Sequence, residues 1–133
     1  MPALRDYRVF ISHAWHRDED YFRVKQMLDE AQNFSWRNYS VPEHDPLPDS
    51  KLAMNLRDQI RPVSIVVILA GMYVAHSDWI QREIDIAREM GKPIIGVKPW
   101  GAQVIPTAVS DAAREVVGWN TQSIVDAIRR HAI

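Results

Sequence analysis

The stretch Ile65-Val66-Val67-Ile68-Leu69 indicates the class of fold more clearly than any other segment. It is the strongest strand pattern in the chain, and its apolar residues occupy both faces of the expected strand. A strand that is apolar on both faces is typical of the centre of a parallel sheet covered by helices on both sides. The pattern therefore predicts that residues 65–69 form a central parallel strand.

Amphipathic segments flank this strand on both sides. The segment before it has helical spacing and ends at Pro62, and the segment after it can begin at a Ser77 or Asp78 cap and end at Gly91. The apolar positions of these two helices are Leu52, Leu56 and Ile60, and then Ile80, Ile84 and Ala87. Further strands are expected at residues 9–11, 34–41, 93–97 and 115–118, and further helices at residues 21–31, 108–114 and from Asn120 or Thr121 onward.

Five strands alternating with about five helices predict an α/β fold with a parallel sheet. We expect one flavodoxin-like three-layer sandwich over residues 1–133, with the five-stranded parallel sheet in the order 2-1-3-4-5. Ligands of such folds bind at the carboxyl ends of the strands where the order reverses, here between the first and third strands. Ser12 and His13 are expected there, together with the helix that carries Trp79 and Glu83.

Composition narrows the classes of function. The 133 residues suit one soluble domain, and a formal net charge of −1 argues against nucleic acid or an anionic membrane as partner. The absence of cysteine excludes disulfides, thiolate catalysis and cysteine-ligated zinc. The longest apolar run, residues 65–72, is too short to cross a bilayer, so a cytoplasmic protein is expected.

Several kinds of site are missing from the sequence. It has no Gly-x-x-x-x-Gly-Lys loop and no Gly-x-Gly-x-x-Gly turn. The third strand ends Leu69-Ala70-Gly71, without the aspartate of a receiver domain, and Ser12 lacks a nucleophile-elbow context. The five histidines are scattered, so a metal site is not expected. A bound cofactor is not expected either.

Trp79 and Glu83 form the remaining chemical constellation. Their i, i+4 spacing places them on one helical stripe, offset from that of Ile80 and Ile84, near a helix N-terminus that favours a carboxylate. A carboxylate beside an aromatic wall suits holding a ribose while a glycosidic bond breaks. The alternative is a solvated glutamate paired with Arg82 or Arg88, beside a tryptophan that only packs.

Three segments then resemble the signatures of TIR domains. YRVFISH at residues 7–13 resembles their first-strand signature, SDWIQREI at residues 77–84 their Ser-x-Trp-x-x-x-Glu-Leu/Ile signature, and GKPIIGV at residues 91–97 the stretch that follows. The segment WRNYS at residues 36–40 looks closest to the TIR-like subgroup of prokaryotic Thoeris antiphage defence. The loop at residues 42–48 lacks the Arg-Asp-x-x-Pro-Gly pattern of receptor-type TIR domains, which argues against receptor-adaptor signalling.

The resemblance implies an enzyme that uses NAD as substrate and cleaves its nicotinamide–ribose bond, as an NAD glycohydrolase or ADP-ribosyl cyclase does. Glu83 matches the catalytic glutamate, and Phe10, Ser12, His13 and Trp79 would line the substrate pocket. The product would be a cyclic or conjugated ADP-ribose signal for a downstream effector, and activity is expected to involve self-association.

Two alternatives stay open. TIR domains also serve as non-catalytic modules that signal by TIR–TIR association, although retention of Glu83 argues against a pure scaffold. A nucleoside deoxyribosyltransferase-like enzyme shares the fold and breaks an N-glycosidic bond, but it normally uses a carboxylate nucleophile in a more carboxylate-rich pocket.

Overall fold

The computed structural model describes residues 6–12, 19–39, 56–69, 77–98 and 106–133. Predictions that concern His13 and the loop at residues 42–48 lie outside these ranges. The described strands form a single sheet in the order β2-β1-β3-β4-β5, and every neighbouring pair is parallel. The predicted flavodoxin-like topology is therefore confirmed, whereas the extent of the domain over the whole chain stays a prediction.

The sheet is built from short strands. Their bounds are Asp6–Ile11 for β1, Ser35–Asn38 for β2, Ile65–Leu69 for β3, Ile94–Val97 for β4 and Glu115–Val117 for β5. β3 has the predicted bounds, and all five of its residues are buried. β1 begins earlier than its apolar residues indicated, because the Asp6 carboxylate accepts hydrogen bonds from Ser35 Oγ and Arg37 Nε, both at 2.6 Å, across the pair with β2.

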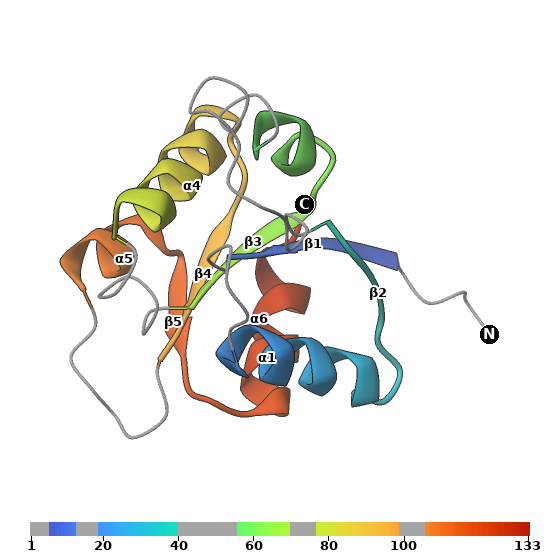
Figure 1. Cartoon of the computed structure of the whole chain (residues 1–133). Helices are drawn as coiled ribbons and strands as arrows, with labels where there is room; N and C mark the ends of the chain where they lie inside the picture. Colours follow the sequence, from blue (N-terminus) through green and yellow to red (C-terminus); the bar gives the residue numbers. More distant parts are fainter. Residues whose placement is uncertain (1–5, 13–18, 40–55, 70–76, 99–105) are drawn as a thin grey trace.

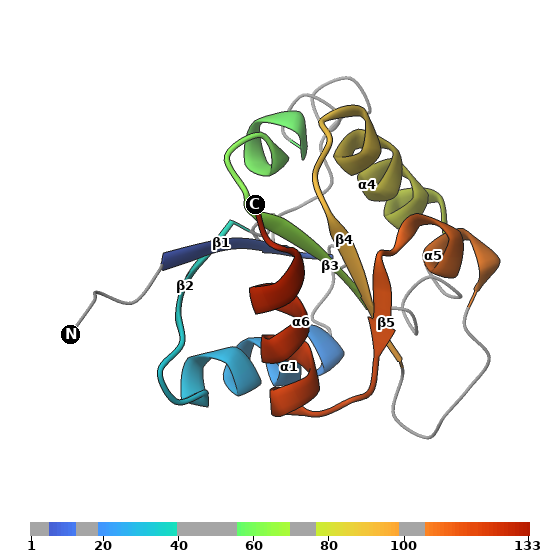
Figure 2. The same ribbon diagram turned by 180° about the vertical axis from the view of Figure 1, so that it is seen from behind.

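Helices cover both faces of the sheet. α1 (Glu19–Glu30) and α6 (Thr121–His131) lie on one face, and α4 (Ser77–Glu89), α5 (Thr107–Ala112) and the helical residues 56–60 lie on the other. The same three layers are visible from behind in Figure 2, and Figure 1 shows the sheet between them. α5 is shorter than predicted because the Arg114 N–H already bonds Ile94 O at 2.7 Å, which draws the chain into β5.

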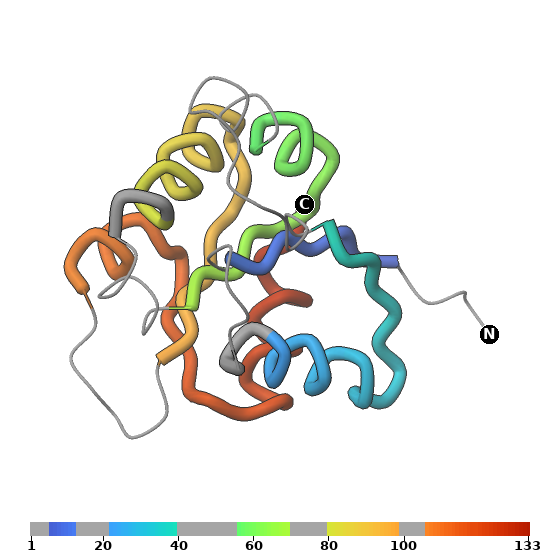
Figure 3. Tube along the Cα trace, viewed as in Figure 1, coloured from blue at the N-terminus to red at the C-terminus, as the bar shows by residue number. Residues whose placement is uncertain are grey.

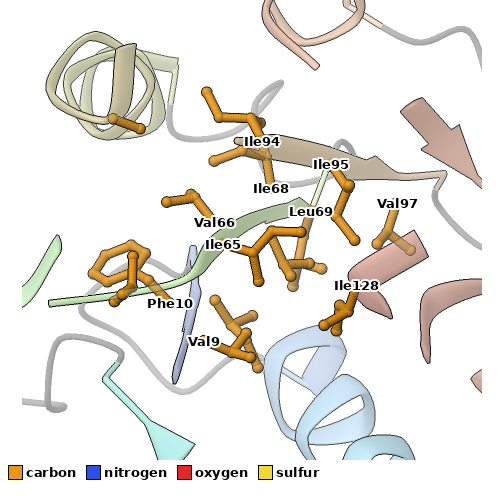
Figure 4. Close-up of a cluster of buried hydrophobic side chains, with 14 of the residues drawn as sticks. Val9, Phe10, Ile65, Val66, Ile68, Leu69, Ile94, Ile95, Val97 and Ile128 are labelled. Atoms are coloured by element: carbon orange, nitrogen blue, oxygen red, sulfur yellow. The ribbon is translucent and has the colours of Figure 1, made fainter. Parts of the chain in front are cut away.

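The apolar core lies between the sheet and both helical layers. Side chains alternate along a strand, so Val66 and Ile68 point to the face covered by α4 while Ile65 and Leu69 point to the other. Figure 4 shows this separation, with Phe10 and Ile94 on the side of Val66, and with Val9, Ile95, Val97 and Ile128 on the side of Ile65. Ile124, Val125 and Ile128 of α6 are buried as predicted.

Local signals set the ends of two helices. The Asn120 side chain accepts a hydrogen bond from the Ser123 N–H at 2.8 Å, which resolves the predicted choice of cap for α6 in favour of Asn120. Gly91 follows α4 with φ of 69°, a left-handed conformation that glycine adopts without steric cost. Both helices therefore form the elements that the sequence indicated.

Candidate functional site

The carboxyl ends of β1 and β3 are joined by a serine. The Ser12 N–H donates to Val67 O at 2.8 Å, and the Leu69 N–H donates to Ser12 Oγ at 3.0 Å. Ser12 is completely buried. The trace in Figure 3 shows β1 and β3 running side by side through the middle of the molecule. This edge is the switch point of the strand order, because β1 leads to α1 on one face and β3 is followed by α4 on the other.

α4 carries the candidate catalytic carboxylate. Its apolar spacing places Ile80, Ile84 and Ala87 against the sheet, and all three are buried as predicted. Glu83 lies on the same inner face and is 0% exposed, with both carboxylate oxygens inaccessible to solvent. The buried face of α4 is therefore wider than the predicted apolar stripe, and the interpretation of Glu83 as a solvated surface residue is wrong.

A buried carboxylate needs a physical reason. Glutamate is almost never fully buried, because removing its charge from water costs free energy, whereas burying an apolar side chain of similar size is favourable. The needs of the helix do not supply that reason, because polar side chains on α4 can face solvent. Gln81 and Asp85 do so, and they form an i, i+4 hydrogen bond of 3.0 Å. Glu83 thus stands out as the one charged residue among the fully buried side chains of the described chain.

The structure brings some of the predicted site residues into one layer. Phe10 is 1% exposed and points to the face of the sheet that α4 covers, where Glu83 is also buried. Ser12 follows at the carboxyl end of the same strand. The backbone of Trp79 lies in the first turn of α4. His13 lies outside the described residues. The roles of all five residues toward a substrate stay predictions.

Sequence reasoning missed the hydrogen bond from Leu69 to Ser12. It assigned Ser12 to the substrate pocket, whereas the Oγ atom is engaged by the backbone of β3. The only sign in the sequence was a polar residue directly after the apolar first strand. Such a residue can form the last hydrogen bond between two strands, or it can contact a ligand. Within the described residues, no group of three or more histidines and carboxylates could hold a metal ion.

The fold and this switch point define a flavodoxin-like α/β protein with a buried carboxylate on the helix after the third strand. The family model described as "Thoeris protein ThsB, TIR-like domain" matches residues 10–104, which is more than half of the chain. The chain belongs to this family. The matched region includes Ser12, β3 and the whole of α4.

A solved structure extends the likeness over nearly the whole chain. The structure titled as the Clostridium botulinum CMP N-glycosidase BcmB has a TM-score of 0.57 and 19% sequence identity, and the match covers 92% of this chain and 98% of that one. At this identity the likeness shows a shared fold. The search of curated proteins gave no significant match. None of the described helices is long and apolar enough to span a membrane.

Proposed function

We propose that this protein is an enzyme that consumes NAD by cleaving the bond between nicotinamide and ribose. The observation that carries the proposal is the complete burial of Glu83 on the inner face of α4, in a chain that belongs to the Thoeris TIR-like family. Glu83 is the residue that matches the glutamate of the TIR signature. Burial strengthens any electrostatic interaction of that carboxylate with a bound ligand, because the local dielectric constant is low.

The chemistry follows from the charge that develops at the ribose. As the C1′–N bond breaks, its electron pair leaves with nicotinamide, and the ribose acquires oxocarbenium character. A carboxylate held near the ribose stabilises this positive charge and binds the ground state less strongly than the transition state. Water then attacks C1′, releasing a proton and ADP-ribose. Capture by an internal nucleophile or by a second molecule yields a cyclic or conjugated product instead.

The product would act as a signal in antiphage defence, sensed by a downstream effector in the cytoplasm, and self-association of this chain would promote activity. The family description supports the Thoeris context. Phe10, His13 and Trp79 are proposed to line the substrate pocket, with Phe10 placed on the same side of the sheet as Glu83.

The test is incubation of the purified protein with NAD, followed by mass spectrometry of the products over a series of protein concentrations. We expect loss of NAD with release of one nicotinamide per NAD consumed. CMP is assayed in parallel, because the structural neighbour is titled a CMP N-glycosidase. Release of cytosine from CMP without turnover of NAD would favour a nucleotide N-glycosidase. No turnover of either compound at any concentration would favour the non-catalytic TIR–TIR module.

A further inference from the structure

We propose that Ser12 is a positioning residue for the cleavage proposed above, which holds the ends of β1 and β3 together so that α4 presents Glu83 correctly to the substrate. This inference rests on the proposed function. A positioning role differs from the substrate-binding role expected from the sequence. The Oγ atom of Ser12 accepts a hydrogen bond of 3.0 Å from the Leu69 N–H.

The hydrogen-bond pattern shows what the side chain replaces. In a parallel ladder, the N–H of a residue donates to one residue of the partner strand. The C=O of the same residue accepts from the N–H two positions further along that partner strand. The Ser12 N–H donates to Val67 O, so the next bond would run from the Leu69 N–H to the main-chain oxygen of Ser12. The hydroxyl oxygen of Ser12 accepts that bond instead. The last rung between β1 and β3 is therefore made by a side chain.

The location of this rung gives it a functional consequence. Leu69 is the last residue of β3, and α4 is the next described element along the chain. The bond fixes the end of β3 against β1 at the switch point, where a ligand of this fold binds. Ile80, Ile84 and Glu83 are all buried on the face of α4 that covers the sheet, so a shift of the β3 end against β1 would also displace the surface on which α4 packs.

A second buried serine supplies a matched control. Ser64 is 2% exposed, and its Oγ atom accepts from the Arg8 N–H at 3.4 Å at the opposite edge of the same two strands. Both serines therefore join β1 to the β3 segment through a side-chain oxygen and a backbone N–H. Only Ser12 lies at the carboxyl edge. Ser64→Ala therefore removes a bond between the strands away from the candidate site, whereas Ser12→Ala removes such a bond at the site.

The experiment measures kcat and KM for nicotinamide release by Ser12→Ala, Ser12→Thr and Ser64→Ala, below the melting temperature of each variant. We expect Ser12→Ala to lower kcat on the order of tenfold to a hundredfold with KM changed by less than about threefold, because misplacement of a catalytic group acts on the transition state. Ser12→Thr keeps the hydroxyl and should recover most of kcat. Ser64→Ala should lower the melting temperature while keeping kcat within about twofold of wild type.

The outcomes distinguish failure of the positioning role from failure of the proposed function. Wild-type kcat in Ser12→Ala, or equal losses of kcat in Ser12→Ala and Ser64→Ala, would overturn the positioning role and leave the proposed function standing. Ser12→Cys, which is similar in size and a weaker acceptor, takes the place of the alanine variant if that variant does not fold. If neither folds, the role of Ser12 is purely structural and the inference is wrong. An inactive wild-type protein overturns the proposed function, and the inference with it.

Discussion

Glu83 is the residue whose placement fold stability explains least. Leucine or methionine at this position would continue the apolar face made by Ile80, Ile84 and Ala87 without the cost of desolvating a charge. A carboxylate held in such a place is a candidate functional group, because active sites retain residues that local stability disfavours. Glu83 is therefore singled out both by its burial and by its match to the TIR signature.

We predict that Glu83→Gln abolishes NAD turnover and leaves the fold intact. The substitution keeps the volume and one oxygen but removes the charge, so a role in stabilising positive charge predicts a loss of about a hundredfold or more, equivalent to ~3 kcal/mol. The measurement is the rate of nicotinamide release, with circular dichroism to check the fold.

Glu89→Gln is the control for this prediction. Glu89 lies near the end of the same helix, where it forms an exposed ion pair of 2.7 Å with Arg57. An exposed pair of this kind contributes about 0–1 kcal/mol, so activity should stay unchanged. Equal turnover by wild type and Glu83→Gln would remove Glu83 from the mechanism.

The sequence predicted the position of Glu83 on its helix but not its burial. Helical periodicity identifies a face by its apolar residues, so a charged residue beside that face is assigned to solvent unless a motif indicates otherwise. The prediction for Ser12 was incomplete for a similar reason. Its location after the first strand followed from the apolar run, whereas the bond to Leu69 depends on strand pairing between residues far apart in the sequence.

At the scale of elements, α5 packs against β4 at a glycine. Gly96 faces this helix, and a Cβ atom at residue 96 would lie 3.1 Å from Val109 Cγ1 and 3.3 Å from Val116 Cγ2. Val109 is fully buried. The small residue in β4 is therefore what allows α5 to cover the strand at this distance.

Gly96→Ala should destabilise the protein by about 1–3 kcal/mol, the usual range for overpacking a buried site. Chemical denaturation monitored by circular dichroism measures the change in the free energy of unfolding. Gly118→Ala is the matched control, because a Cβ there would lie 3.6 Å from the Asn120 amide nitrogen, an ordinary contact distance. Similar stability of the two variants would mean that α5 can shift away from β4 at little cost.

The start of α6 gives a second test at this scale. Asn120→Ala removes the side-chain acceptor of the Ser123 N–H and should cost ~1 kcal/mol, whereas Asn120→Asp keeps an acceptor and should stay close to wild type. Urea unfolding of the three proteins checks the difference. If Asn120→Asp loses as much stability as Asn120→Ala, the loss reflects something other than the cap.

Most element types were predictable here because the longer helices have a clear apolar period and the central strands are continuous apolar runs, and β3 was predicted with its observed bounds. The ends of β1, β2 and α5 differed because pairing sets them. β2 is confined to Ser35–Asn38 by its register with β1, and the polar residue Asp6 joins the sheet through Ser35 and Arg37. Such contacts are made across the fold and leave no periodic signal in one segment.

Over the whole molecule, the order of the strands connects the fold to the candidate site. The centre of the sheet is β1 and β3, and helices on opposite faces follow these two strands. That divergence is what opens a crevice at the carboxyl edge of doubly wound sheets. The topology could be predicted because the alternation of elements indicates a parallel sheet, the apolarity of residues 65–69 on both faces indicates a central strand, and 2-1-3-4-5 is a common strand order for such folds.

The last strand and the last helix are joined by a charge cluster that makes the stability of the molecule depend on pH. Arg130 Nη2 contacts both oxygens of Glu115 at 2.8 Å, and His131 Nε2 lies 2.9 Å from Glu115 Oε1. The hydrogen bonds from Arg130 and then from His131 hold the pKa of Glu115 below its ordinary value of 4.5. A carboxyl group with a lowered pKa in the folded state stabilises the fold above that ordinary value, and the contribution is lost as the pH falls through the lowered pKa.

We therefore predict that Glu115→Gln has a lower melting temperature than wild type at pH 7, and that the gap narrows as the pH falls below 4.5. Raising the salt concentration to about 1 M should also narrow the gap at pH 7, because the Debye length falls to roughly 3 Å and the cluster is partly exposed. Thermal unfolding followed by circular dichroism at several pH values measures both effects. Asp111→Asn, an exposed carboxylate on α5, is the control and should show a small gap throughout. A gap for Glu115→Gln that stays constant between pH 7 and pH 3 would contradict the linkage, because a loss through packing of β5 alone does not depend on protonation.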